Sequence, residues 1–254
     1  MIPSHIENYI KQYTILIIIL YNNINNNMNS FIQTYYFSLF IQFITFFIQL
    51  YGYLLPTTQT ILPLKYALNA EFFVSIIEFI VYIWIAFSLK NLDTVMAKRY
   101  IDWFITTNSM LIAICLLFIH YNQEENIKIS NRKNTFENLI TKNISIFASI
   151  LLFNNLMLGI GYLGEKNIIP IRYSFSIGFV FFAASFYLIY ENFAKYSQYG
   201  KNAFYIITTI WALYGVAHLL GKIGKNTAYN ILDLISKNAL GIFLVYSVYN
   251  KIHS

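Results

Sequence analysis

Residues 70–89 read AEFFVSIIEFIVYIWIAFSL, a predominantly apolar stretch that contains two glutamates, Glu71 and Glu78. At a rise of about 1.5 Å per residue, about 20 such residues cross the hydrocarbon core of a bilayer as one helix. Similar stretches occur at Phe31–Leu55, Arg99–His120, Ile144–Tyr162, Ile171–Tyr190, Ala203–Leu220 and Tyr229–Tyr249. The sequence therefore predicts an all-α membrane protein, a bundle of seven transmembrane helices.

The composition of the whole chain agrees with this interpretation. Of its 254 residues, 57% are hydrophobic and only 11% are charged, whereas soluble domains carry about 25% charged residues. The single cysteine, Cys115, excludes an internal disulfide, and no Cys/His spacing indicates a metal site. The net charge of +6 is dispersed rather than gathered in a basic stripe, so we expect no nucleic-acid binding.

Residues 1–30 are predicted to form an N-terminal extension that precedes a seven-helix domain at residues 31–254. The apolar segment Thr14–Leu20 is too short to span a bilayer, and the asparagine-rich tract Asn22–Asn29 follows it. We expect a short extra N-terminal helix, interfacial or surface-packed, and then a linker; an eighth span and a cleaved leader are the alternatives. A small excess of basic residues in one set of loops favours an extracellular N-terminus and a cytoplasmic C-terminus.

Five ionisable residues lie well inside predicted spans: Glu71, Glu78, Asp102, Asp233 and Lys237. On insertion scales a charge at mid-bilayer costs at least about 2.5–3.5 kcal/mol, so each of them needs a partner or an aqueous path. The alternative is a buried ion pair that only fixes helix packing, but such pairs seldom add net stability over apolar substitutes. We therefore interpret these residues as functional.

The spacing of Asp233 and Lys237 is informative, since residues four apart lie on one face of a helix. Desolvation of Lys237 favours its neutral amine, which can condense with an aldehyde, and the protonated product is a fixed cation that needs a carboxylate. Asp233 is placed to be one counterion, and Asp102 on the third span supplies a second. Arg99, one turn from Asp102, can balance the excess negative charge.

At these residues the sequence resembles a microbial (type 1) rhodopsin. The stretch RYIDWFITT, residues 99–107, is similar to the third-helix signature of that family, and DLISK, residues 233–237, is similar to the seventh-helix motif that carries retinal. The resemblance extends from about residue 31 to the C-terminus. It implies all-trans retinal as the cofactor, held as a covalent Schiff base on Lys237.

The resemblance also implies roles for individual positions. Asp102 is implied as primary proton acceptor and counterion, and Asp233 as second counterion. Arg99 is implied to organise the exit-side charges and Thr106 to hydrogen-bond Asp102. The residues implied to contact retinal are Tyr100, Trp103, Thr107, Met157, Gly161, Trp211, Tyr214 and His218. Ordinary core packing is the alternative for the aromatic ones, because the chain has 22 tyrosines and 23 phenylalanines.

Several residues depart from the family pattern. Ser176 and His218 stand at positions around the retinal ring where tryptophan is common. His218 can tune colour or titrate, with a hydrogen-bonded core histidine as the alternative. Ala113 stands where proton pumps have their cytoplasmic proton donor, and alanine cannot hold a proton. The departure at Ala113 therefore disfavours a fast vectorial pump.

Polar residues on the second and seventh helices favour ion conduction instead. Glu71 and Glu78 are seven residues apart and thus nearly aligned on one face, while Asn226, Asn230 and Asn238 add neutral polar groups on the seventh helix. Together they could line a polar seam in which carboxylates select cations. This combination resembles the viral group of light-gated cation channels within the microbial rhodopsins. The resemblance implies a passive cation pore that retinal isomerisation opens.

The predicted function is therefore a light-gated cation channel, with a light-driven outward proton pump as the alternative. A sensory rhodopsin and a membrane scaffold without retinal are further alternatives. The predicted partners are membrane lipid, conducted cations (Na+, K+ and H+) and, as an option, further copies of the chain in a homo-oligomer. The prediction includes neither enzymatic activity nor a metal.

Overall fold

The computed structural model describes the backbone of residues 4–125 and 136–253, with side chains from residue 27 onward apart from residues 136, 137 and 139. Every element in these ranges is a helix. Along the chain they are α1 (Ser4–Leu54), η1 (Gln59–Ile61), α2 (Leu62–Ala86), α3 (Leu92–Glu125), α4 (Phe136–Lys142), α5 (Ile144–Glu165), α6 (Ile171–Asn192), η2 (Ala194–Tyr196), α7 (Gln198–His218), α8 (Lys222–Asp233), η3 (Leu234–Ala239) and α9 (Leu240–His253).

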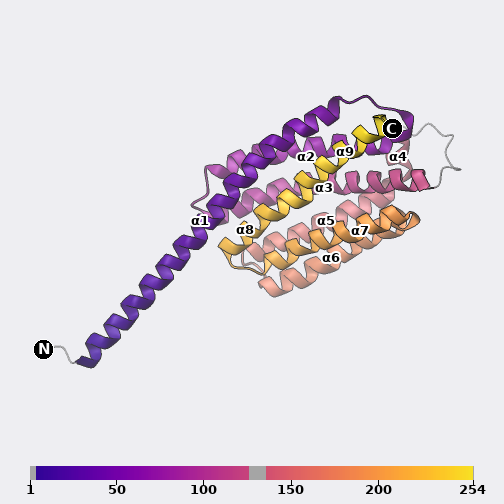
Figure 1. The fold of residues 1–254 in the computed structure, drawn as a ribbon. Coiled ribbons are helices and arrows are strands. Elements are labelled where there is room, and N and C mark those ends of the chain that lie inside the picture. The colour runs from indigo at the N-terminus through magenta and orange to yellow at the C-terminus, as the bar shows by residue number, and fades with distance from the viewer. Residues whose placement is uncertain (1–3, 126–135, 254) are drawn as a thin grey trace.

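The long helices of the described chain pack as a bundle of seven rods: α1, α2, α3, α5, α6, α7 and the continuous segment α8–η3–α9 (Figure 1). Neighbours in sequence pack together, α2 on α3 and α5 on α6, and the last rod closes the bundle against α1, α2 and α7. The predicted fold class, an all-α seven-helix bundle, is confirmed.

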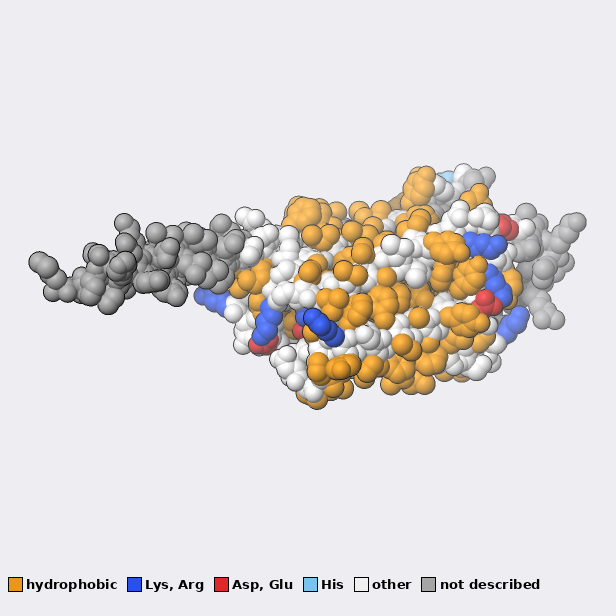
Figure 2. Space-filling model, turned by 90° about the horizontal axis from the view of Figure 1, so that it is seen from below, with side chains coloured by type: hydrophobic (Ala, Val, Ile, Leu, Met, Phe, Trp, Pro, Cys, Tyr) orange, Lys and Arg blue, Asp and Glu red, His pale blue; other side chains and the backbone are white. Residues whose placement is uncertain are grey.

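The bundle has the surface of a membrane protein. By length and composition, six helical segments of the described chain can cross a bilayer, and these include every rod except α7. The 21 residues of α7 measure about 30 Å at 1.5 Å per residue, which also matches the hydrocarbon core. Figure 2 shows apolar side chains over the middle of one face and charged side chains toward its two ends. The chain is therefore a multi-pass membrane protein.

The N-terminal extension differs from the expectation of a short helix and a linker. The described backbone of α1 is continuous through the asparagine-rich tract, over 51 residues in all, and its first part projects beyond the bundle (Figure 1). No proline or glycine occurs between Ser4 and Tyr51. Asparagine lowers helix propensity by at most about 0.7 kcal/mol per residue, so nothing local ends the helix. The predicted domain boundary at residue 30 stays a prediction, and no break in the secondary structure of α1 marks it.

The segment that carries Lys237 is a π-helix, η3, between the α-helical segments α8 and α9. A π-helical turn replaces the usual i→i+4 hydrogen bonds by i→i+5 bonds, and such turns occur frequently at functional sites. The sequence carries no signal for this local widening. The π-helical segment places Ser236, Lys237 and Asn238 in the interior of the bundle, where all three side chains are buried.

Candidate functional site

Lys237 is only 3% exposed, and its amino group faces three carboxyl groups. Its Nζ donates a hydrogen bond to Asp102 Oδ2 at 2.8 Å, while Glu78 Oε1 lies at 3.4 Å and Asp233 Oδ1 at 3.9 Å. These carboxyl groups come from α3, α2 and α8. The fold thus brings together four of the five intramembrane charges that the sequence singled out, as an ion cluster.

Arg99 supplies a second buried cation to this cluster. Its side chain is 1% exposed, and its Nη1 lies 3.0 Å from Asp233 Oδ2. Its Nε donates to Asn226 Oδ1 at 3.2 Å, and its Nη2 donates to Asn230 Oδ1. Both asparagines were predicted to line a pore, but in the structure their side chains bind the guanidinium of Arg99. They lie on α8, which begins at Lys222, two turns before the predicted start of the seventh span.

Two tyrosines fix the carboxylate of Asp233. Tyr82 Oη donates to Asp233 Oδ2 at 2.6 Å, and Tyr214 Oη donates to Asp233 Oδ1 at 2.8 Å. Hydrogen bonds to an ionised acceptor are roughly twice as strong as neutral ones. Tyr214 was predicted as a retinal contact, whereas Tyr82 was missed. The sequence does contain a signal for Tyr82, because this residue follows Glu78 by four positions and therefore lies on the same face of the second helix.

The ion cluster contains two basic groups, Arg99 and Lys237, and three carboxyl groups. If Asp102, Asp233 and Glu78 were all ionised, three negative charges would face two positive ones and leave a net charge of −1. An uncompensated buried charge costs several kcal/mol, so one carboxyl group must hold a proton. Asp102 and Asp233 accept hydrogen bonds, whereas neither oxygen of Glu78 has a hydrogen-bond partner among the described residues. We therefore assign the proton to Glu78.

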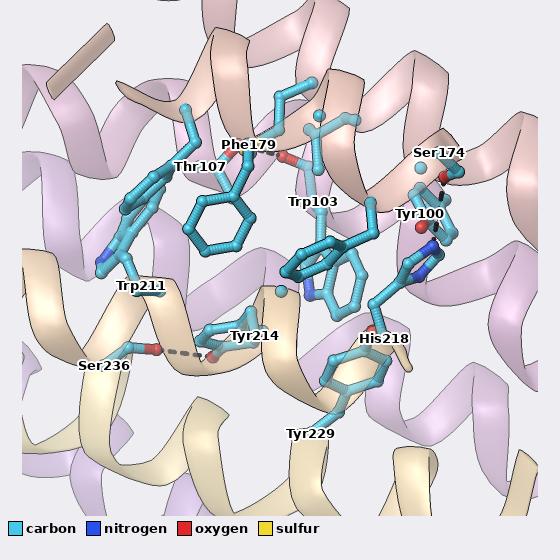
Figure 3. Close-up of a pocket in the computed structure, with 18 of the residues that line it drawn as sticks. Tyr100, Trp103, Thr107, Ser174, Phe179, Trp211, Tyr214, His218, Tyr229 and Ser236 are labelled. Carbon is cyan, nitrogen blue, oxygen red and sulfur yellow. Dashed lines mark hydrogen bonds between the residues drawn. The ribbon is translucent and has the colours of Figure 1, made fainter. Parts of the chain in front are cut away.

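A cavity lined by residues of α3, α5, α6 and α7, and by Lys237 of η3, lies between these helices (Figure 3). Its walls are mostly apolar, as is typical of ligand pockets. All the residues predicted to contact retinal line this cavity: Tyr100, Trp103, Thr107, Met157, Gly161, Trp211, Tyr214 and His218. The structure thus gathers residues from three helices that only the resemblance had connected.

The cavity fits a molecule with an apolar body and an aldehyde at one end. Lys237 lines the cavity next to Ser236, which lies near one end of the residues labelled in Figure 3, and Asp102 Oδ1 has no hydrogen-bond partner among the described residues. Along the wall, Gly161 leaves the space that the Tyr100 ring occupies, because a Cβ there would lie 2.8 Å from Tyr100 Oη. Retinal has this chemistry, and Lys237 and Asp102 are the residues that would hold its reactive end.

Two predicted positions differ in detail. Thr106 does hydrogen-bond Asp102, but its Oγ1 donates to the backbone carbonyl oxygen at 2.9 Å and not to the carboxylate. Ser176 is exposed and donates to the carbonyl oxygen of Arg172, while Ser174 lines the cavity. The correction at Ser176 is a matter of helix phase, since two residues along α6 turn the side chain by about 200°.

A polar seam, which we define as the buried polar side chains between α1, α2 and η3, lies on the other side of the ion cluster. Glu71 is 1% exposed and belongs to it, as do Ser75 of α2 and Asn238, whose Nδ2 donates to Thr45 Oγ1 at 2.7 Å. On α1 the buried members are Ser38, Gln42, Thr45 and Gln49. The α1 residues were missed, although their i, i+4, i+7, i+11 spacing marks one face of a helix.

The fold and the site together define the class of seven-helix membrane proteins that hold retinal on a lysine. Residues 33–251 match the family of bacteriorhodopsin-like proteins, and the chain belongs to this family. The predicted resemblance to microbial rhodopsins is confirmed at this level. Microbial rhodopsins bind retinal through a lysine Schiff base, and they are photoreceptors and transporters rather than enzymes.

Individual relatives are more distant. The chain is 26% identical over 172 residues to the green-light absorbing proteorhodopsin of Gamma-proteobacterium EBAC31A08, a match that covers 60% of this chain and 61% of that protein. The chain thus spans about three fifths of the length of this curated relative. A blue-light absorbing proteorhodopsin from Gamma-proteobacterium Hot 75m4 is also 26% identical, over 176 residues that cover 60% of this chain and 61% of the relative.

Among solved structures, the chain resembles the viral rhodopsin OLPVRII, with 27% identity, a TM-score of 0.70 and coverage of 87% of this chain and 97% of the other. It also resembles a blue light-absorbing proteorhodopsin from Med12, with 19% identity, a TM-score of 0.67 and coverage of 89% and 99%. The second likeness concerns the fold alone.

Proposed function

We propose that this protein is a light-gated cation channel of the viral group of microbial rhodopsins. When bound through Lys237, retinal would supply the absorption of light and a change of shape that displaces the attached nitrogen. The chain then has two tasks, which are to accept a proton from that nitrogen and to open a path for cations. The ion cluster serves the first task and the polar seam the second.

Asp102 is placed to accept the proton. Its Oδ2 is the nearest acceptor to the Lys237 nitrogen, at 2.8 Å, within the reach of direct proton transfer. Transfer neutralises both partners and removes the attraction that holds the carboxylate of Asp233 toward the nitrogen at 3.9 Å, and the protonated Glu78 at 3.4 Å no longer faces a cation. The contact between α2, α3 and η3 is thereby weakened at the point where the ion cluster meets the polar seam.

The observation that carries the channel proposal is a concentration of buried polar atoms without partners. Among the described residues, hydrogen-bond partners are lacking for both oxygens of Glu71, both amide atoms of Gln42, Gln49 Oε1 and Asn238 Oδ1. At least about 90% of buried polar groups in proteins are hydrogen-bonded, to protein or to ordered water. A cluster of exceptions in one seam supports its occupation by water, and a wet seam supports ion passage.

The acidic residues along the proposed path favour cations. Glu71 belongs to the polar seam, and Glu78, assigned as neutral before illumination, lies where the ion cluster meets the seam; rings or pairs of carboxyl groups select cations in pores. A proton pump is less well supported, because Ala113 at the usual donor position packs among Leu116 and Leu117 in an apolar cluster. Such surroundings hold no proton to return to the Lys237 nitrogen. We propose Na+, K+ and H+ as the conducted ions.

A photocurrent–voltage curve measured in two sodium gradients tests the proposal. A channel's current reverses sign at a voltage that follows the gradient, and we expect this result. A current that stays outward at every voltage would establish the pump instead, and a coloured protein without current would indicate a sensory role. Glu71→Gln should change conductance or selectivity. Glu191→Gln is the matched control, because Glu191 pairs with Lys195 on the surface of α6.

The orientation in the membrane is part of the same proposal. We propose that the N-terminus is extracellular and the C-terminus cytoplasmic, which rests on the basic residues of the loops. A tag after residue 254 should bind antibody only in permeabilised cells. Binding to intact cells would reverse the assignment.

A further inference from the structure

Four polar side chains from four helices form a buried group at the end of the cavity far from Lys237. Glu165 of α5 accepts at one oxygen, Oε1, from His218 Nδ1 at 2.9 Å and from Lys225 Nζ at 2.6 Å. Ser174 Oγ lies 3.2 Å from His218 Nε2. In Figure 3 His218 and Ser174 lie at one end of the labelled residues, and Ser236, the chain neighbour of Lys237, lies near the other.

The hydrogen bonds of this group fix the protonation of His218. Ser174 Oγ donates its single proton to the carbonyl oxygen of Ile160 at 2.9 Å, so it can only accept from His218 Nε2. The carboxylate of Glu165 likewise can only accept from Nδ1. Both ring nitrogens must therefore carry hydrogen, and an imidazole with two N–H groups is a cation.

The group carries more positive than negative charge. Lys225 and His218 face the single carboxylate of Glu165, which leaves a net charge of +1. Of these three residues only His218 lines the cavity, so its charge is the one that a bound molecule meets. Two titratable phenols, those of Tyr100 and Tyr229, lie near His218 in Figure 3 and also line the cavity. Trp211 and His218, at opposite ends of the α7 wall of the cavity, are seven residues apart, which corresponds to about 10 Å along the helix.

We propose that His218 is a colour-determining residue, an imidazolium at the ring end of retinal that shifts absorption to shorter wavelength. This inference rests on retinal being bound to Lys237. In a protonated retinal-linked amine the positive charge lies mainly at the nitrogen, and excitation spreads it toward the ring. A cation at the ring end therefore raises the energy of the excited state more than that of the ground state.

The first test compares the absorption of two pigments, formed from His218→Gln and His120→Gln with all-trans retinal. Loss of the cation should move the absorption band of His218→Gln to longer wavelength by on the order of 10 nm. This size assumes that excitation moves part of the chromophore's positive charge to within a few ångströms of the imidazolium, at an effective dielectric constant of about 20. His120 is the matched control, because it is equally buried but lies outside the cavity. An unchanged band, or a shift to shorter wavelength, in His218→Gln would overturn the proposal.

A second measurement needs no variant and no retinal. Nitrogen NMR of the retinal-free protein at neutral pH should show two protonated ring nitrogens for His218, and a single protonated nitrogen would overturn the assignment. Both readouts concern colour or protonation rather than current. A coloured protein with a shifted His218→Gln variant but no channel current would thus overturn the channel proposal alone.

Discussion

The exchange of Asp102 for asparagine, compared with that of Glu78 for glutamine, tests the charge assignment of the ion cluster. The two carboxyl groups lie at 2.8 and 3.4 Å from the Lys237 nitrogen. At an effective dielectric constant of about 20, a full negative charge at these distances attracts a cation by about 6 and about 5 kcal/mol. If both groups were ionised, the two substitutions would have nearly equal effects.

With the proton on Glu78, the two substitutions differ sharply. Asp102→Asn removes a negative charge that stabilises the cation in the ground state more than in the excited state. Absorption should therefore move to longer wavelength, by roughly tens of nanometres on the basis of the same Coulomb energy. Glu78→Gln exchanges one neutral group for another and should leave the band almost unchanged. Absorption spectra of the two pigments at neutral pH decide between these cases. Equal shifts in the two variants would show that Glu78 is ionised.

Three further predictions concern the surroundings of the ion cluster. Tyr82→Phe removes a hydrogen bond to the charged Asp233 and should lower the free energy of unfolding by about 1.5–3 kcal/mol; thermal bleaching at an unchanged temperature would contradict this role. Gly161→Leu should prevent pigment formation, because a Cβ there would lie 2.8 Å from a tyrosine oxygen, whereas Gly159→Leu, with no atom within 4 Å, should bind retinal normally. Asn238→Leu should reduce the photocurrent of a pigment with normal absorption, and an undiminished current would remove this residue from the conduction path.

The sequence predicted the parts of this protein that depend on local order. Seven apolar stretches are visible without tertiary information, because the length of a membrane span and its composition are properties of a continuous segment. The spacing of Asp233 and Lys237 placed both on one helix face for the same reason. Single polar residues within apolar spans, such as Glu78, were conspicuous because a bilayer penalises them.

The parts that could not be predicted depend on contacts between helices. The contacts of Asp102 and Glu78 with the Lys237 nitrogen were expected from the resemblance and from the packing of neighbouring helices, but their distances depend on how α2, α3 and η3 pack, and local spacing alone does not fix the rotation of each helix. The hydrogen bonds of Glu165 to His218 and Lys225 join helix ends that are 53 to 60 residues apart in the chain. The π-helical segment that contains Lys237 is a further tertiary feature without a sequence signal.

The central claim is that the side chain of Lys237 carries retinal, and one measurement tests it directly. The purified protein is incubated with all-trans retinal, the imine is reduced with borohydride, and the modified residue is located by mass spectrometry of peptides. We expect a visible absorption band and a retinyl group on the peptide that contains Lys237, with neither in Lys237→Ala. A band that persists in Lys237→Ala, or a retinyl group on another lysine, would contradict the account.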